Sequence, residues 1–168
     1  MGETDAEDKQ QGLALWQEQL QHGEQAARME AVEMLGQLAD KRAIAPLAAL
    51  FNDPDPALRL RAVLALRQIG GPLAVAALAG ALTNELPRVR RAAIVAVGKL
   101  GGSQAVALLL TTLQDPDERV RNTAILTLGE TGDVQALSAL LQLQEHSQQK
   151  IDAVYLQHAI QRLRQLDT

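Results

Sequence analysis

The chain has 168 residues, contains no cysteine and carries a net charge of −4. The lack of cysteine excludes disulfides, a thiol nucleophile and a thiolate metal site, and the acidic balance argues against a nucleic-acid-binding protein. Apolar residues make up 47% of the chain but aromatic residues only 2%, so alanine and leucine supply nearly all of the buried surface. Small alanine faces let helices approach closely, which favours a stack of short helices.

The N-terminal region carries no recognisable targeting signal. Residues 1–11 are acidic and polar, without the apolar segment of a secretory signal peptide. The longest uncharged run covers residues 68–84, but Gly70, Gly71 and Pro72 interrupt it and leave a stretch too short to span a bilayer. These features predict a cytoplasmic protein that is not embedded in a membrane.

The chain is expected to begin with a frayed acidic segment, residues 1–9, followed by a capping helix pair, residues 10–39. The first helix of this pair carries Leu13, Trp16 and Leu20 on one stripe, at i, i+3 and i+7 spacing. Trp16 is the only tryptophan, and we expect it to be buried, where it would close the end of an otherwise open core.

Residues 40–133 contain a motif that recurs with a fixed period. It begins as Asp53-Pro-Asp-Pro-Ala-Leu-Arg59 and returns further along the chain as Asp115-Pro-Asp-Glu-Arg-Val-Arg121. A third copy, Asn84-Glu-Leu-Pro-Arg-Val-Arg90, falls midway between them and gives the sequence a 31-residue period. A period of this length is typical of a solenoid built from repeated helix pairs.

Each repeat is predicted to contain two helices joined by a turn. The turn begins with Asp53, Asn84 or Asp115, whose side-chain oxygen can accept hydrogen bonds from the free amides of the next helix. Glycines that we expect in left-handed C-caps follow the second helices at positions 70, 101 and 132. The first helices are predicted at 43–51, 74–83 and 105–113, and the second helices at 57–69, 88–100 and 118–131.

Residues 134–168 form a degraded repeat that is predicted to cap the array. His146 stands where the turn aspartate is expected, and Asp152 replaces the recurring arginine. Repeat arrays commonly end in such atypical units. The whole chain is therefore predicted to be one all-α domain, a right-handed α-solenoid of about five helix pairs.

The repeat consensus resembles a known family. It reads Gly-Asp-x-x-Ala-Val/Leu-x-x-Leu, then Asp-Pro-Asp-x-x-Val-Arg-x-x-Ala, then Leu-Gly-x-x-Gly. This pattern is similar to a HEAT repeat, specifically the short HEAT-like type of the phycobilisome lyases, and the resemblance covers about residues 24–145. The resemblance supports the solenoid fold strongly but specifies function weakly, since such arrays perform many tasks.

The resemblance also implies a ladder between neighbouring repeats, formed by the turn aspartate and the arginine of the second helix. Asp53 with Arg59 and Asp115 with Arg121 match this pattern, whereas Asn84 and Asp152 depart from it. The residues assigned to the structural ladder are Asp53, Arg59, Arg90, Asp115 and Arg121.

No motif in the sequence predicts self-contained catalysis. HEAT-type deoxyhypusine hydroxylases, which the chain resembles in its repeats, hold iron with His-Glu pairs, but Glu145-His146 has the reverse order. The Gly98–Ser103 segment lacks the preceding strand and the Gly-Lys-Ser/Thr end of a phosphate-binding loop, so it is better explained as a helix end. We therefore expect no metal and no cofactor, and the sequence favours a non-enzymatic protein.

The most suggestive cluster is basic and lies on the second helices, which line the concave face of HEAT arrays. Leu64, Val95 and Leu126 occupy equivalent positions on this face and have two interpretations. Either they join the core between repeats, or they form an apolar ridge that grips a partner. On the second interpretation, the predicted partner-binding residues are Arg61, Leu64, Arg91, Val95, Lys99, Asn122 and Leu126.

Two function hypotheses follow from different classes. In the first, the chain is a non-enzymatic scaffold or adaptor that binds another protein with an acidic or mixed-charge surface, without contacting nucleic acid. Peripheral association with a larger complex, in its assembly or maintenance, is a variant of this hypothesis. The alternative, implied by the family resemblance, is a subunit of a bilin lyase or a phycobiliprotein-handling factor.

Overall fold

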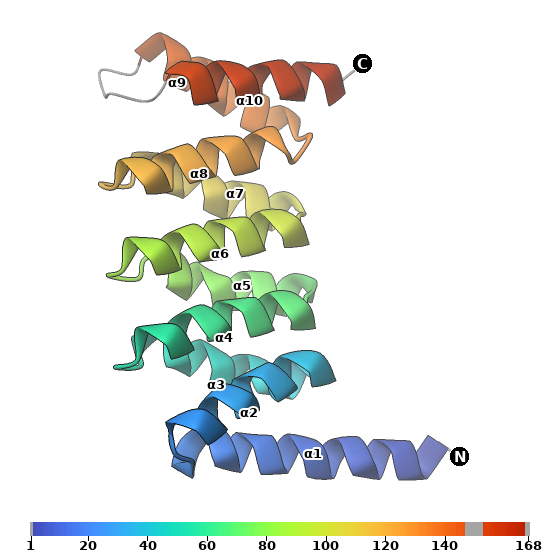
Figure 1. Cartoon of the computed structure of the whole chain (residues 1–168). Coiled ribbons are helices and arrows are strands. Elements are labelled where there is room, and N and C mark those ends of the chain that lie inside the picture. Colours follow the sequence, from blue (N-terminus) through green and yellow to red (C-terminus); the bar gives the residue numbers. More distant parts are fainter. Residues whose placement is uncertain (1, 147–152, 167–168) are drawn as a thin grey trace. The chain divides into compact units, whose positions relative to one another are not determined.

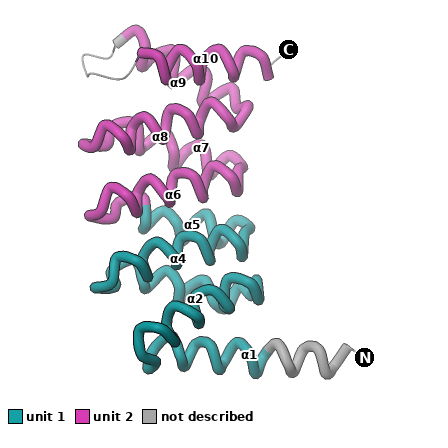
Figure 2. The backbone as a smooth tube through the Cα atoms, in the orientation of Figure 1, with its two compact units in different colours: residues 1–81 teal, residues 82–168 magenta. Residues whose placement is uncertain are grey.

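The structure, a computed structural model, describes residues 2–146 and 153–166, with the side chains of residues 10–145 and 153–166. These residues form ten α-helices and three short 3-10 helices, without a strand in the described ranges (Figure 1). The predicted all-α fold is therefore confirmed. The chain divides into two compact units, residues 1–81 (unit 1) and residues 82–168 (unit 2), coloured separately in Figure 2.

Unit 1 is built from helical hairpins that stack through their second helices. Within it, α1 packs against α2, α2 packs against α4, and α3 packs against α4. The helices of this unit are α1 (Gly2–His22), α2 (Gln25–Leu38), α3 (Ile44–Ala49), flanked by the 3-10 helices Lys41–Ala43 and Leu50–Asn52, α4 (Pro56–Ile69) and α5 (Gly71–Leu82), whose last residue belongs to unit 2.

Unit 2 repeats the same arrangement. Figure 2 shows α6, α8 and α10 side by side, and the hairpin partners α7 and α9 pack against α8 and α10 respectively. The helices of this unit are α6 (Pro87–Leu100), α7 (Ser103–Thr111), followed by the 3-10 helix Thr112–Gln114, α8 (Glu118–Gly129), α9 (Val134–His146) and α10 (Ala153–Leu166). Every predicted repeat helix is present, with boundaries shifted by a few residues.

The repeat period is directly visible in the core. Equivalent positions of the second helices hold small or branched apolar side chains that are almost completely removed from water. Burial of each valine or isoleucine contributes roughly 1.5–3 kcal/mol, so the repeated core is a main source of stability in each unit. The fully buried members of the two most regular sets are Ala31, Ala62, Ala93 and Ala124, and Val32, Val63, Ile94 and Ile125.

The N-terminal helix differs from the expectation in two respects. Helix α1 begins at Gly2, so residues 2–9, which we expected to be frayed, are helical in the structure. Leu13 and Leu20 are each 4% exposed, as their spacing predicts, but Trp16 is only half-buried. The indole is therefore partly exposed to solvent, and Trp16 is less buried than we predicted.

Two of the three repeat turns use two acidic positions rather than one. Asp53, Asn84 and Asp115 each accept a hydrogen bond from the amide two residues later, at 2.8, 3.0 and 2.9 Å. That amide belongs to the N-cap residue. The first free amides of the helix itself therefore need a second carboxylate as their hydrogen-bond acceptor. Asp55 supplies it for α4 by accepting from the Ala57 amide at 2.8 Å, and Asp117 supplies it for α8.

The glycines that end the second helices are not ordinary left-handed caps. Gly70 has φ 70° and ψ −173°, and Gly101 has φ 70° and ψ −166°. The positive φ was expected, but the extended ψ differs from a left-handed helical residue, because the chain turns directly into the next helix. Gly132 also has a positive φ, yet α8 has already ended at Gly129.

The capping role of Asp55 has a consequence for acid stability. The Ala57 amide, followed by the Gln25 side chain, lowers the pKa of the Asp55 carboxyl below its ordinary value. A depressed folded-state pKa contributes stability above the unfolded value of about 3.9 and loses it as the pH falls through the folded value. We expect Asp55→Asn, which can still cap the helix, to flatten this acid-side loss in thermal melts between about pH 5 and pH 2. An unchanged pH profile would contradict the assignment.

Candidate functional site

The ladder between repeats is formed by an arginine and the aspartate of the following turn. The Arg90 guanidinium donates from Nε and Nη2 to both carboxylate oxygens of Asp115, each at 2.7 Å. The side chains of Arg90 and Asp115 are only 10% and 7% exposed. In unit 1, Arg28 pairs with Asp53 in the same register. The ladder therefore links residues 25 positions apart.

The ladder that the family resemblance implied joins neighbouring repeats, whereas the aspartate and arginine of one repeat meet through a backbone carbonyl. Arg59 donates to the carbonyl oxygen of Asp53, and Arg121 donates to the carbonyl oxygen of Asp115 at 2.7 Å. The carboxylates themselves face the arginine of the preceding repeat. The Asp115 carboxylate raises the pKa of Arg90, since its hydrogen bonds and charge favour the protonated guanidinium. Arg28 is the ladder residue that the sequence assignment missed, although it lies one repeat period before Arg59.

A shallow groove of about 340 Å³ runs between α6 and α8 in unit 2. Gly98 and Thr127 make the two helices approach closely there, because a Cβ on Gly98 would lie 2.1 Å from the Thr127 methyl group. Both apolar and charged side chains line the groove. They are Arg91, Val95, Lys99, Thr123, Leu126, Thr127 and Glu130. Four of the predicted partner-binding residues therefore meet in one place.

Two of the three apolar positions of the predicted ridge are exposed. Leu64 on α4 is 46% exposed and Val95 on α6 is 39% exposed, while Leu126 on α8 is half-buried. The interpretation that these side chains belong to the core between repeats is therefore wrong for Leu64 and Val95.

The basic side chains around the ridge have weak, exposed partners. Arg91 donates from Nε to the Thr123 hydroxyl at 3.1 Å, and Lys99 lies 3.5 Å from the Glu130 carboxylate. In unit 1, Arg61 lies 3.6 Å from the carboxylate of Glu33. The sequence analysis did not predict these partners, Thr123, Glu130 and Glu33. The 31-residue period could have indicated one of them, because it places residue 130 at the position equivalent to residue 99.

Asn122 does not join the groove. It occupies the position equivalent to Arg91 but on α8, where it is half-buried, and its Oδ1 atom is buried without a hydrogen-bond partner in the described structure. The prediction that Asn122 contacts a partner alongside Val95 and Leu126 therefore has no support from the groove itself.

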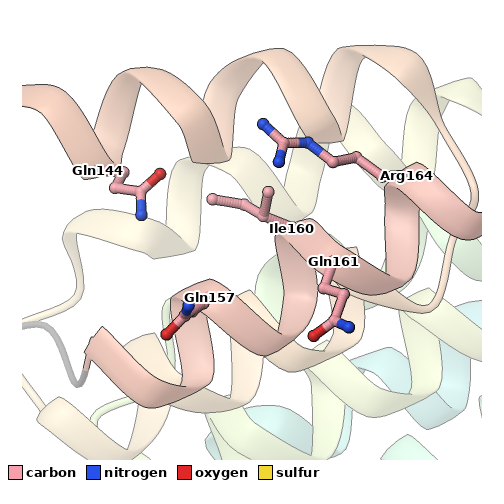
Figure 3. Close-up of a pocket in the computed structure, with 5 residues that line it drawn as sticks. All are labelled: Gln144, Gln157, Ile160, Gln161 and Arg164. Atoms are coloured by element: carbon pink, nitrogen blue, oxygen red, sulfur yellow. The ribbon is translucent and has the colours of Figure 1, made fainter.

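A second cavity, of about 380 Å³, lies between α9 and α10 (Figure 3). Arg164 extends from α10 over Ile160 toward the side of α9 that carries Gln144, while Gln157 and Gln161 lie at its edge. The lining is dominated by uncharged amides, so it offers hydrogen bonds but no acid–base pair. Nothing in this arrangement resembles a catalytic constellation.

The described part of the chain holds neither a metal-binding cluster nor a membrane-spanning helix. Within those residues, no group of three or more histidine, cysteine, aspartate or glutamate side chains could hold a metal ion. In the same ranges, every helix is too short or too polar to cross a bilayer.

The stacked hairpins, the arginine–aspartate ladder and the recurring glycine turns define a helical-repeat protein. The HEAT-repeat family model matches residues 13–94 and 81–164, and the chain belongs to the HEAT-repeat family. The HEAT-repeat fold fits a protein-binding role. No curated protein sequence matches the chain.

Solved structures show the same fold at low sequence identity. Human deoxyhypusine hydroxylase in complex with glycerol is 21% identical, with 91% of this chain and 74% of that chain covered and a TM-score of 0.56. An engineered protein is 20% identical, with 92% of this chain and 80% of that chain covered and a TM-score of 0.55. At this level of identity the likeness concerns the fold alone.

Proposed function

We propose that the chain is a non-enzymatic scaffold that binds an acidic or mixed-charge segment of another protein in the α6–α8 groove. The observation that carries this proposal is the exposure of Val95 between Arg91 and Lys99, beside the half-buried Leu126. Interfaces typically combine an apolar centre with a charged rim, and arginine is enriched among the residues that contribute most to binding.

The basic side chains of the groove can exchange their present partners for a carboxylate of the bound protein. The Lys99–Glu130 contact spans 3.5 Å, and both side chains are about half exposed or more. Exposed pairs of this kind contribute only about 0–1 kcal/mol, so a partner carboxylate can replace Glu130 at little cost. Among the described residues, Arg91 is held by the Thr123 hydroxyl, and the remaining donors of its guanidinium can make a bidentate contact with a carboxylate.

Unit 1 carries the same combination on α4. Arg61 and Leu64 occupy the repeat positions equivalent to Ala92 and Val95, and both side chains are exposed. In our proposal these residues provide a second contact of the same kind. Arg61 would then exchange its contact with Glu33 for the partner's carboxylate.

The proposal predicts that Arg91→Glu/Lys99→Glu weakens partner capture from host extract at low salt without lowering thermal stability. Charge reversal opposes an acidic partner, while the exposed native pairs contribute little to folding. The matched control is Arg88→Glu/Arg119→Glu, which makes the same charge change at exposed positions outside the groove, one on α6 and one on α8. Two results would contradict binding in the groove. One is that both variants lose the partner to the same extent, and the other is that Arg91→Glu/Lys99→Glu loses thermal stability along with the partner.

The second candidate is a subunit of a bilin lyase or a phycobiliprotein-handling factor. It rests on the short repeat motif, in which Asp115-Pro-Asp is followed by Val120 and Arg121. A member of that class should change the visible absorbance of a linear tetrapyrrole when an apo-phycobiliprotein and a partner subunit are present. An unchanged spectrum under those conditions would remove this candidate and leave the scaffold proposal intact.

A further inference from the structure

The groove residues on α6 form a regular line along the helix. Arg91, Val95 and Lys99 follow one another at intervals of four residues, so they lie on one face and all three are exposed. Each interval corresponds to a rise of about 6 Å along the helix axis, which separates the two cations by about 12 Å. The exposed face of α6 therefore carries a basic, an apolar and a second basic side chain in a fixed order.

Helix α8 lies beside α6 and runs in the same direction (Figure 2). Arg91 donates to the Thr123 hydroxyl near the start of the two helices, and Lys99 contacts the Glu130 carboxylate near their ends. The half-buried Leu126 lines the groove between these two contacts. The centre of the groove is therefore apolar, and each end has a cation whose present contact is exposed.

The backbone along the groove offers no amide donors to a bound segment. Residues 91–99 lie beyond the first turn of α6, and residues 123–130 lie beyond the first turn of α8, so their N–H groups donate within their own helices. An extended segment over Val95 and Leu126 would bury backbone amide groups without partners, which opposes binding. A helical segment satisfies its backbone groups internally and presents only side chains to a groove.

We propose that the occupant of the α6–α8 groove is an amphipathic α-helix of a partner protein, with a carboxylate, a large apolar residue and a second carboxylate at positions i, i+4 and i+8. This inference rests on the proposed function and adds the secondary structure and residue spacing of the bound segment. The spacing places the carboxylates opposite Arg91 and Lys99, and the apolar side chain over Val95 and Leu126. The pattern is symmetric, so it is compatible with a helix running in either direction.

The test titrates the full chain into three fluorescein-labelled, alanine- and glutamine-based peptides and follows fluorescence anisotropy at low salt. The first peptide carries glutamate, leucine and glutamate at i, i+4 and i+8. The second has its leucine at i+2, on the opposite face of the helix, and the third adds prolines at i+2 and i+6 to the first, which break the helix. We expect the first peptide to bind with a Kd about tenfold lower than either control, because burial of one leucine changes a binding constant by at least about that factor.

Charge reversal in the protein links the peptide to the groove. Arg91→Glu/Lys99→Glu should lose the first peptide and should instead bind a version with lysine in place of both glutamates. Arg88→Glu/Arg119→Glu, with the same charge change outside the groove, should still bind the first peptide.

The helical inference is overturned if the shifted or the proline peptide binds as tightly as the first, or if none of the three binds. Equal binding of all three that is lost on Arg91→Glu/Lys99→Glu would overturn the helix alone, because the groove would still bind an acidic segment. Binding that Arg91→Glu/Lys99→Glu leaves unchanged would overturn the proposed function of the groove as well.

Discussion

Asp115→Ala should lower the free energy of unfolding by about 3–5 kcal/mol, the usual cost of removing one partner from a buried ion pair. The Asp115 carboxylate accepts two hydrogen bonds from Arg90 and one from the Asp117 amide, and its side chain is 7% exposed. Without it, the Arg90 guanidinium stays buried with two unpaired donors. Chemical denaturation monitored by circular dichroism measures the change directly.

Two comparison variants show whether burial causes the effect. Glu130→Ala removes the acidic partner of Lys99, whose contact is exposed and 3.5 Å long, and should cost no more than about 1 kcal/mol. Asp115→Asn retains the turn hydrogen bond that Asn84 makes naturally, and should fall between the two. Equal losses for Asp115→Ala and Glu130→Ala would contradict the structural importance of the ladder.

Gly129→Ala should lower the free energy of unfolding by about 1–2 kcal/mol, although alanine is the better helix former. A Cβ at position 129 would lie 2.8 Å from both the Cα and the Cβ of Ala159, so α8 and α10 would have to move apart. Overpacking of this kind typically costs about 1–3 kcal/mol, which exceeds the gain of at most about 1 kcal/mol from helix propensity.

The same substitution in α1 should have the opposite sign. A Cβ at Gly12 would meet no atom within 4 Å, so Gly12→Ala should raise the free energy of unfolding by about 0.5–1 kcal/mol. The pair is compared by denaturant titration under one set of conditions. A stabilising Gly129→Ala would mean that the second helices of unit 2 do not pack as closely as the structure shows.

The repeat architecture was predictable because the same motif occurs several times in the sequence. One copy of the Asp-Pro-Asp motif has an ordinary turn as its simplest explanation, but copies at Asp53 and Asp115 with a related copy at Asn84 define a period. Helix boundaries then followed from the prolines and glycines, whose backbone preferences are local. The family match across residues 13–164 agrees with that interpretation.

The ladder pairing could not be deduced in the same way. The resemblance implied a ladder between neighbouring repeats, with Asp53 and Arg59 matching its residue pattern, but it did not fix which arginine meets which carboxylate. In the structure Arg59 donates to the backbone carbonyl of Asp53. The carboxylate instead meets Arg28, at a spacing of 25 positions. Which of the two arginines meets the carboxylate depends on how the helices of neighbouring repeats stack. The sequence of a single repeat does not contain that information.

The candidate groove was only half predictable. Repeat register placed Leu64, Val95 and Leu126 on one face, but periodicity alone does not say whether that face is covered. The structure shows Leu64 and Val95 exposed. Close helix contacts at Gly98 explain how α6 and α8 can pack together while their outer face stays open, because the small residue lies at the contact and the larger side chains lie outside it.

The measurement that tests the scaffold proposal most directly is site-specific photocrosslinking in host extract. A photoreactive phenylalanine analogue at position 95 should crosslink one discrete protein, and the same analogue at position 119 should not, since Arg119 is exposed on α8 outside the groove. Addition of Arg91→Glu/Lys99→Glu to the position-95 variant should abolish the product. Identical products from both positions, or an undiminished product after charge reversal, would contradict a binding site in the α6–α8 groove.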